Sequence, residues 1–370
     1  MDPELLRIDP DIRRAHTLPA ELYLSPRAYE EVRERVFARS WQFLGDVDRL
    51  AAPRQCVPFT LLPGCLDQPL LFTRDERGDL HGLSNVCTHR GTVLCEEEKN
   101  TQGLRCRYHG RRFALDGKFV SMPEFEGVEH FPAPEDDLAR VPFALWRRFL
   151  FAGVAPAFPF DQLVAELEQR VGWLPIERAA HDPARDRDYT VQANWALYCD
   201  NYLEGFHIPF VHPALNTALD FTSYRTELFR YSSLQVGTAS GGEHVFELPR
   251  SSPDHGQQVA GYYFWLFPNL MLNVYPWGIS VNIVLPQAPD RTIVRFRSYV
   301  WDAARLDLGA GSGLHQVEME DEGVVEAVQR GVRSRFYQHG RYSPTREQGV
   351  HHFHRLLAEF VLGNRGTLDA

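Results

Sequence analysis

The spacing of apolar residues changes along the chain and predicts different structures in different stretches. Residues 25–40 place apolar side chains at helical spacing after Ser25, which can cap a helix, so a helix is predicted there. From about residue 41 to residue 151 the apolar positions form short runs separated by Gly, Pro and Asp. Such runs are typical of short strands and turns, and they predict a small all-β module.

The longer remainder of the chain mixes helical and strand-like spacing. Helices are predicted at about 161–171, 194–206 and 314–338, and aromatic strands at about 261–285 and 291–301. Because this order favours a sheet packed against long helices, the expected fold class is α+β.

These patterns divide the chain into three predicted parts. A helical segment spans residues 1–40 and packs on the last part, an all-β domain spans 41–152, and an α+β domain spans 153–370. With 370 residues, of which 44% are hydrophobic, the chain can build more than one core, and this rules out disorder.

Charge and targeting signals narrow the possible partners. The 49 acidic and 39 basic residues give a net charge of −10, which offers no basis for general nucleic-acid binding. The start MDPELLRIDPDIRR lacks the features of a secretory signal, and no uncharged apolar run reaches the roughly 18 residues of a transmembrane helix. We therefore expect a soluble, cytoplasmic protein without a membrane partner.

The six cysteines are too few and too unevenly spaced for a disulfide scaffold, so reduced thiols or metal ligands are expected.

Two short segments of the predicted β module each offer one cysteine and one histidine. They are Cys87-Thr-His89 and Cys106-Arg-Tyr-His109, with 16 residues between His89 and Cys106. Zinc is one candidate, but zinc fingers place the cysteines together and the histidines together. In a Rieske [2Fe–2S] cluster, two cysteines bind one iron and two histidines bind the other. Two segments that each supply one cysteine and one histidine can provide these ligands. The mixed order therefore favours a Rieske cluster.

The segment 194–212 contains a second candidate metal site. If its first part is helical, Glu204 and His207 share one polar stripe. Pro209 favours an end of the helix near His207, and the turn that follows can bring His212 back toward the same point. Two histidines so placed could bind one divalent metal ion.

Asp321 is the candidate third ligand of this site. In the predicted helix 314–338 it begins an inward stripe that otherwise contains Val325, Val328, Val332 and Phe336. A buried carboxylate needs a charge partner such as a metal, whereas the alternative is that Asp321 faces solvent beside Glu318, Glu320 and Glu322. Two histidines and one carboxylate form the facial triad of non-haem Fe(II) oxygenases.

With both sets of residues, the sequence resembles the α subunit of a Rieske non-haem iron oxygenase over nearly its whole length. The segments DNYLEGFHIPFVHP, PNLMLNVYPWG, EMEDEGVVEAVQRGVRS and HHFH are similar to segments of choline, carnitine and glycine-betaine monooxygenases. The resemblance implies an all-β Rieske domain followed by a helix-grip catalytic domain, an antiparallel sheet with long helices. It also implies a terminal oxygenase that uses O₂ and external electrons to hydroxylate or N-demethylate a small quaternary-ammonium substrate.

The resemblance assigns roles to individual residues and implies partners. Those that would hold the cluster are Cys87, His89, Cys106 and His109, and those that would hold a mononuclear Fe(II) are His207, His212 and Asp321. Glu204 matches the family's bridging carboxylate, which is Asp in many members and Glu in some. A homotrimer is implied, with electrons passing from the cluster of one chain to the iron of its neighbour. The electrons would come from NAD(P)H through a separate reductase or a ferredoxin.

The cluster loop departs from the family at one position. The chain has His109-Gly110-Arg111 where oxygenase relatives usually have His-Gly-Trp, which leaves the ligands intact but changes the packing of the loop. We expect Arg111 and Arg112 to attract an acidic electron donor, with ion pairs between subunits as the alternative. Cys95 lies between the ligand segments and is expected to be a buried thiol.

Aromatic residues in two predicted strands suggest how a substrate could be bound. In alternating positions, Tyr263 with Trp265 and Tyr275 with Trp277 could line a cavity under the helix that carries His207. Aromatic faces attract a quaternary ammonium group. The alternatives are that these rings form the core of the sheet, or that the apolar cavity serves an aromatic-ring-hydroxylating or dealkylating oxygenase.

Two further functions remain open at the level of sequence. A Rieske electron carrier would need only the first domain, and His207, His212 and Asp321 argue against it. A structural zinc protein would lack the visible absorption of a [2Fe–2S] cluster.

Overall fold

The computed structural model of the protein describes residues 3–241 and 244–363 and divides into two compact units. One unit is Ala38–Ala157. The other joins the segment that ends at Phe37 to the segment that begins at Phe158, so the smaller unit is an insertion in the larger one.

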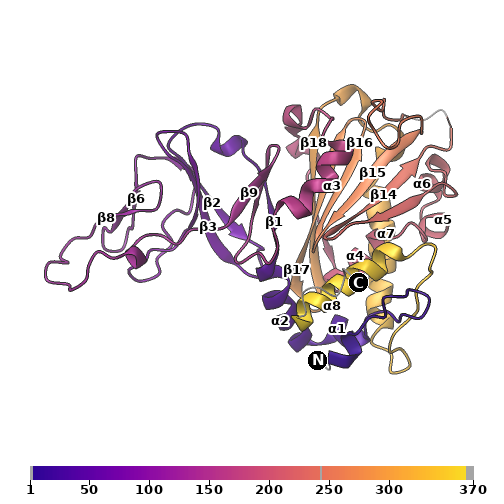
Figure 1. Cartoon of the computed structure of the whole chain (residues 1–370), viewed down its shortest axis with the longest axis horizontal. Coiled ribbons are helices and arrows are strands. Elements are labelled where there is room, and N and C mark those ends of the chain that lie inside the picture. Colours follow the sequence, from indigo (N-terminus) through magenta and orange to yellow (C-terminus); the bar gives the residue numbers. More distant parts are fainter. Residues whose placement is uncertain (1–2, 242–243, 364–370) are drawn as a thin grey trace. The chain divides into compact units, whose positions relative to one another are not determined.

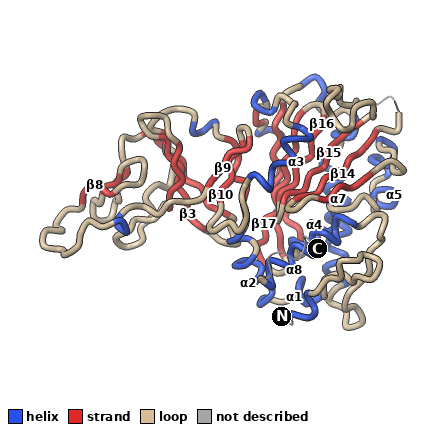
Figure 2. Tube along the Cα trace, viewed as in Figure 1, coloured by secondary structure: helices blue, strands red, loops and turns tan. Residues whose placement is uncertain are grey.

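Antiparallel sheets build the smaller unit (Figure 2). Its strands are β1 (Gln42–Asp46), β2 (Gln55–Leu61), β3 (Gln68–Arg74), β4 (Leu80–Ser84), β5 (Lys99–Asn100), β6 (Leu104–Arg105), β7 (Arg112–Phe113), β8 (Phe119–Ser121), β9 (Phe143–Trp146) and β10 (Phe149–Ala152). They pair in the orders β1-β10-β9, β4-β3-β2-β5 and β6-β7-β8. Leu70 and Phe72 of β3 face one core, and Leu71 between them faces a second core that contains Cys87 and Cys106. Because the side chains of β3 alternate between the two cores, Leu71 packs in the core of the predicted cluster site.

The larger unit contains one antiparallel sheet of eight strands (Figure 1). Its strands are β11 (Ala180–His181), β12 (Arg187–Val191), β13 (Arg225–Leu228), β14 (Ser232–Thr238), β15 (Val259–Leu266), β16 (Leu270–Tyr275), β17 (Gly278–Ala288) and β18 (Arg291–Val300). The order is β11-β18-β17-β16-β15-β14-β13, and β12 also pairs with β18.

Helices cover both faces of this sheet. They are α1 (Ala20–Leu24), α2 (Pro26–Arg35), α3 (Asp161–Val171), α4 (Trp195–Tyr202), α5 (Ile208–Val211), α6 (Pro213–Ala218), α7 (Leu314–Gly331) and α8 (Gln348–Leu362). On one face of β15, Trp265 packs against Phe353 of α8 with ring centroids 5.2 Å apart. On the other face, Tyr262 donates a hydrogen bond to Asp254, which pairs with Arg170 of α3. Helix α4 contacts α7, α8 and β17, so it lies on the α8 side (Figure 1).

The predicted α+β class is confirmed. The helix predicted at 161–171 is α3, with the predicted bounds, and the other three predicted helices exist but are shorter. The helix expected at 25–40 is α2, which ends at Arg35, and the Oγ of Ser25 accepts a hydrogen bond from the amide of Ala28 at 3.3 Å. Helix α7 ends at Gly331, seven residues before the predicted end at 338. In the described part of the chain, no helix combines the length and apolar character needed to cross a bilayer.

Candidate metal centres

The two predicted ligand loops of the smaller unit have the same backbone arrangement. The amide of Cys87 donates to the carbonyl of Thr92, and the amide of Cys106 donates to the carbonyl of Arg111, both at 2.8 Å. In each loop the glycine four residues after the cysteine donates back to the cysteine carbonyl at 3.0 Å. These glycines have φ of 74° and 77°, in the left-handed region that favours glycine. The repeated spacing of cysteine and glycine therefore folds into two matching turns.

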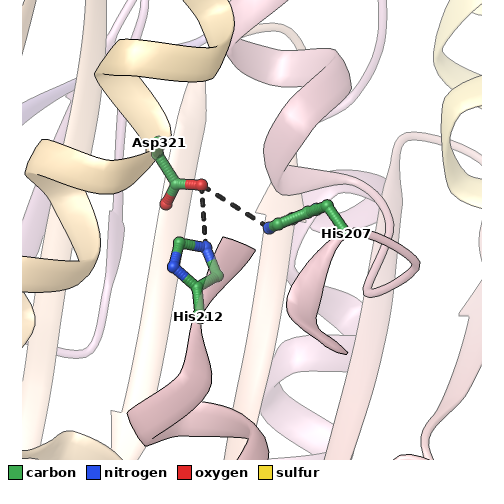
Figure 3. Close-up of side chains that lie close together, drawn as sticks. All are labelled: His207, His212 and Asp321. Carbon is green, nitrogen blue, oxygen red and sulfur yellow. Dashed lines mark hydrogen bonds and ion pairs between the residues drawn. The ribbon is translucent and has the colours of Figure 1, made fainter. Parts of the chain in front are cut away.

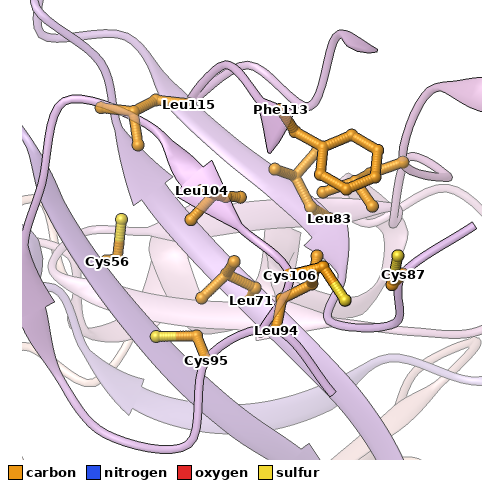
Figure 4. Close-up of a cluster of buried hydrophobic side chains, with 11 residues drawn as sticks. Cys56, Leu71, Leu83, Cys87, Leu94, Cys95, Leu104, Cys106, Phe113 and Leu115 are labelled. Carbon is orange, nitrogen blue, oxygen red and sulfur yellow. The ribbon is translucent and has the colours of Figure 1, made fainter. Parts of the chain in front are cut away.

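The two cysteines of these loops lie close to each other, and so do the two histidines. Cys87 and Cys106 are each 2% exposed in the core drawn in Figure 4, whereas the rings of His89 and His109 lie nearer the surface with centroids 4.8 Å apart. The Nδ1 of His109 is buried and has no hydrogen-bond partner in the described part of the chain. A buried ring nitrogen without a partner, next to a second imidazole and two free thiols, fits a metal cluster with sulfur ligands inside and nitrogen ligands outside.

The backbone around Cys106 favours a thiolate. Burial raises the pKa of Cys87. Burial also acts on Cys106, but hydrogen bonds from the backbone amides of Tyr108 and His109 outweigh it and lower the pKa of that thiol. Since the thiolate is the form that binds metal, the loop is prepared for a ligand role. Cys95 is a buried free thiol in the same core, as expected.

Arg111 cannot contact an electron donor, so the prediction for this residue is wrong. Its side chain is 2% exposed and donates to Asp136, with Nη2 2.5 Å from Oδ1. The guanidinium carbon lies 5.7, 4.9 and 5.5 Å from the ring centroids of Phe113, Phe119 and Phe131. The arginine therefore fills an aromatic pocket, where cation–π contacts and one ion pair replace solvent.

The pair Arg111–Asp136 also connects the two ligand loops. The main-chain oxygen of Asp136 accepts hydrogen bonds from the Oγ1 of Thr88 at 2.8 Å and from Arg111 at 3.2 Å. Thr88 lies between the ligands of the first loop, and Arg111 follows those of the second. Arg112 is exposed, so only this arginine of the two remains a candidate for donor docking.

In the larger unit, His207, His212 and Asp321 point toward one another (Figure 3). The Oδ1 of Asp321 lies 3.0 Å from Nε2 of His212 and 3.5 Å from Nε2 of His207, and one ligand atom from each residue falls within 4.8 Å of the others. His207 directly precedes α5, His212 stands between α5 and α6, and Asp321 lies in α7. Two imidazoles and one carboxylate on one side of a point fit a divalent metal ion with open positions.

Neighbouring polar groups fix the orientation of all three side chains. Glu204 binds Nδ1 of His207 at 2.7 Å, and Glu320 binds Nδ1 of His212 at 2.7 Å. Asn201 donates to Asp321 at 2.6 Å. Because both histidines use Nδ1 for a carboxylate, the lone pair of Nε2 faces the shared point. Asn201 and Glu320 were not predicted, although Asn201 occupies the same polar stretch as Glu204.

These carboxylates also act on His212 when no metal is bound. Burial lowers the pKa of His212, but the hydrogen bonds to Asp321 and Glu320 outweigh burial, so the pKa is raised. A metal at Nε2 must displace that proton, and metal binding at this site is therefore favoured by higher pH.

The route of the chain through this site differs from the prediction. Helix α4 ends at Tyr202, five residues before the predicted end near His207, and Glu204 lies in the following turn. The Oε2 of Glu204 accepts hydrogen bonds from the amides of Phe206 and His207, so its carboxylate closes the turn. This turn, not a continuous helical stripe, places Glu204 against His207.

The inward face of α7 was predicted correctly only in part, because Val325 and Val332 are buried but the other two apolar positions are not. Val328 is 42% exposed and Phe336, beyond the end of the helix, is fully exposed. The buried side chains of α7 are those of Glu318, Val325 and Gln329. Glu318, which the sequence analysis named only as a neighbour in the solvent-facing alternative for Asp321, therefore points inward.

A cavity of about 110 Å³ lies against the three candidate ligands. A cavity of about 150 Å³ can hold benzene, so this smaller one limits the ligand to a molecule of about that size or less. Tyr263 and Tyr275 line it as predicted, with ring centroids 6.0 Å apart. Tyr198, Tyr202 and Tyr224 also line it and were not predicted to do so. The chain offered no local signal for Tyr224, because it reaches the cavity from the stretch before β13.

The two tryptophans of the prediction do not line this cavity. Trp265 is fully buried and packs on Phe267 and Phe353, which is a core position. Trp277 stacks on Tyr275 at 5.4 Å and lines a neighbouring cavity. Trp277 therefore packs against a tyrosine of the cavity wall, whereas Trp265 belongs to the core.

Models of two protein families match the chain. Residues 40–132 match the Rieske [2Fe-2S] domain, and residues 176–363 match the ring hydroxylating alpha subunit (catalytic domain). The first match includes all four candidate cysteine and histidine ligands of the smaller unit, and the second includes the three candidate ligands of the larger one.

Several proteins of known name are similar over almost the whole chain. The chloroplastic choline monooxygenase of Arabidopsis thaliana is 33% identical and covers 94% of this chain and 84% of its own length. The carnitine monooxygenase oxygenase subunit of Escherichia coli is 28% identical, with 94% of both chains covered.

Solved structures show the same fold. The quaternary ammonium Rieske monooxygenase CntA in complex with L-carnitine has a TM-score of 0.74 at 23% identity, covering 97% of this chain and 99% of that one. Naphthalene 1,2-dioxygenase from Rhodococcus has a TM-score of 0.69 at 19% identity, with 95% of both chains covered.

Proposed function

Because the chain belongs to the Rieske non-haem iron oxygenases as an α subunit, we propose that it hydroxylates or N-demethylates a small quaternary-ammonium compound. One observation carries the choice of substrate. The cavity beside the candidate iron ligands has five tyrosines on its wall and, among the described residues, no lysine or arginine. Aromatic faces attract a quaternary ammonium group by roughly 0.5 to 2 kcal/mol per well-placed ring. The choline and carnitine monooxygenases among the relatives support the same substrate class.

The enzyme is an oxidoreductase with a Rieske [2Fe–2S] cluster and a mononuclear non-haem iron as cofactors. We propose that the residues that would hold the cluster are Cys87, His89, Cys106 and His109, and that those that would hold the iron are His207, His212 and Asp321. When bound, the cluster transfers electrons singly and the iron activates O₂ beside the substrate.

The side chains around the second site prepare it for this chemistry. Glu204 and Glu320 hold Nδ1 of the two histidines, so Nε2 stays in place for the metal. The tyrosine wall orients the ammonium group and excludes water from the reacting carbon. Hydroxylation of an N-methyl group would give a carbinolamine that loses formaldehyde, whereas choline would be attacked at its carbinol carbon.

An α subunit of this family needs an electron donor. We propose that an NAD(P)H-dependent reductase or a ferredoxin delivers the electrons, and that the exposed Arg112 contributes to its docking. We further propose a homotrimer in which Glu204 connects His207 to His109 of a neighbouring copy. The solved structure of CntA gives insights into inter-subunit electron transfer in that protein, which supports the arrangement.

We propose that residues 41–152 form the cluster domain, that 153–370 form the catalytic domain and that 1–40 pack on the latter. The contacts of Tyr23 support the third assignment, because its hydroxyl donates to Asp200 of α4 at 3.1 Å and lies 3.3 Å from His354 of α8. The compact unit Ala38–Ala157 supports the assignment of residues 41–152 to the cluster domain.

An O₂-uptake assay tests the proposed function. The iron-loaded protein with a surrogate reductase would be offered choline, carnitine, glycine betaine and benzoate. We expect at least one quaternary amine to stimulate O₂ uptake and to yield a stoichiometric product. Stimulation by benzoate with no response to any amine would contradict the proposal and would favour an aromatic-ring hydroxylase.

A further inference from the structure

Glu318 is a buried carboxylate that the two metal sites do not use. It lies in α7 one helical turn before Asp321, on the wall of the cavity, and is 3% exposed. Its Oε2 accepts a hydrogen bond from the hydroxyl of Tyr198 at 2.6 Å. Its Oε1 is buried and has no hydrogen-bond partner within the described residues. A buried carboxylate oxygen without a partner is costly, so a partner from outside the chain is indicated.

The charges around the cavity leave Glu318 uncompensated. Glu204, Glu318 and Asp321 are the carboxylates on its wall, and Glu204 and Asp321 are both committed to the iron site. A divalent iron offsets two of these negative charges and leaves the third. Burial raises the pKa of Glu318 well above its usual range, and the hydroxyl of Tyr198 lowers it in turn. A permanent cation in the cavity would favour the ionised form and would restore neutrality.

No cation of the protein's described residues is placed to fill this role. Arg185 and Arg187 line a neighbouring cavity that shares Phe296 and Leu314 with the first. Arg185 is bound to Asp307, and Arg187 donates to the backbone carbonyls of residues 184 and 186. The positive charges of these two arginines are therefore bound by other groups and do not compensate Glu318.

A second wall residue shows what the other end of the ligand should offer. Gln235 is 2% exposed, lines the same cavity and donates from Nε2 to the carbonyl of Tyr202 at 2.6 Å. Its Oε1 is buried and, in the part of the chain described, lacks a donor. Since Glu318 and Gln235 both present a bare acceptor, the cavity lacks a positive charge and a hydrogen-bond donor. A carboxylate would supply neither.

We propose that Glu318 recognises the positive charge of the substrate, and that the cavity selects a quaternary amino alcohol over a zwitterion that carries a carboxylate. This inference rests on the proposed function and narrows its substrate class. The ammonium group favours the ionised form of Glu318, so a carboxylate tail on the same molecule would add a second negative charge to the cavity at low local dielectric. The hydroxyl of an amino alcohol can instead donate to Gln235 while the ammonium group lies near Glu318 and the tyrosine rings.

Isothermal titration of the iron-loaded protein tests the inference without turnover. The ligands would be choline, glycine betaine and 3,3-dimethylbutan-1-ol, which has the shape of choline but no charge. We expect choline to bind about 10- to 100-fold more tightly than either, as for a hydrogen bond or contact with a charged group. Equal binding of choline and its neutral analogue, or tighter binding of glycine betaine, would overturn the inference.

Substitutions then assign the effect to Glu318. Glu318→Gln should lower choline affinity by about 10- to 100-fold and leave the neutral analogue unchanged. Glu322→Gln is the matched control, because Glu322 lies on the same helix, also has a buried oxygen without a partner in the described chain, and does not line the cavity. Iron content and circular dichroism confirm the fold of both variants. If Glu318→Gln does not fold, the three ligands on the unmodified protein still decide.

The outcomes separate this inference from the proposed function. If glycine betaine stimulates O₂ uptake and binds better than choline, the proposed function holds and the role of Glu318 is wrong. If no amine stimulates O₂ uptake and benzoate does, the proposed function itself fails.

Discussion

Removing the charge of Arg111 should destabilise the smaller unit strongly although the residue is no metal ligand. Breaking a buried ion pair from one side costs about 3–5 kcal/mol, because the other charge stays behind. Here Asp136 is 21% exposed and keeps a hydrogen bond from the amide of Ala133, so the lower end of that range applies. Arg111→Met retains the apolar stem but also loses the three cation–π contacts. We expect a loss of about 3 kcal/mol.

Urea unfolding followed at the visible absorption of the cluster measures this loss. With a slope of about 2 kcal/mol per molar urea, 3 kcal/mol lowers the midpoint by about 1.5 M. Arg112→Met is the matched control, and as an exposed substitution it should change stability by no more than about 0.5 kcal/mol. Combining Arg111→Met with Asp136→Asn should recover part of the loss, since the unpaired charge is removed. An unchanged midpoint for Arg111→Met would refute the reasoning.

Three other predictions concern the catalytic unit, the donor and acid stability. Glu204→Gln should retain iron but slow substrate-coupled reoxidation of the cluster about 10- to 100-fold, because His207 loses a carboxylate at 2.7 Å; unchanged single-turnover kinetics would exclude this role. Arg112→Glu should weaken turnover with the physiological donor at low ionic strength and less at high ionic strength, and a salt profile like that of the unmodified protein would count against docking. Burial lowers the pKa of His352 to about 4. The unfolded chain therefore binds a proton near pH 6.5 that the fold does not, and stability should fall by up to about 3 kcal/mol as the pH drops from about 6.5 to 4. His352→Leu should flatten this part of the urea-unfolding profile, and an equally steep profile would assign the acid sensitivity to other groups.

The candidate metal-binding stretches could be recognised in the sequence because their geometry is local. Cys87 and Cys106 each stand four residues before a glycine, and that spacing is sufficient to build the turn that presents the sulfur. His207 and His212 are likewise close in the chain, and Pro209 limits how the backbone can connect them. The bounds of α4 could not be predicted in the same way. The turn after Tyr202 is closed by the carboxylate of Glu204, and a helical pattern does not reveal that side-chain contact.

The buried positions of Arg111 and Glu318 could not be predicted, for one physical reason. A buried charge is stable only with its partner, and the partner can be far away in the sequence. Asp136 follows Arg111 by 25 residues, and Tyr198 precedes Glu318 by 120. The local pattern around each residue is a run of like charges, which favours a solvated surface when no partner is known. An acidic run on a helix can therefore contain one carboxylate that faces a cavity. The structure identifies it by its hydrogen-bond partner on another element, here Tyr198 of α4.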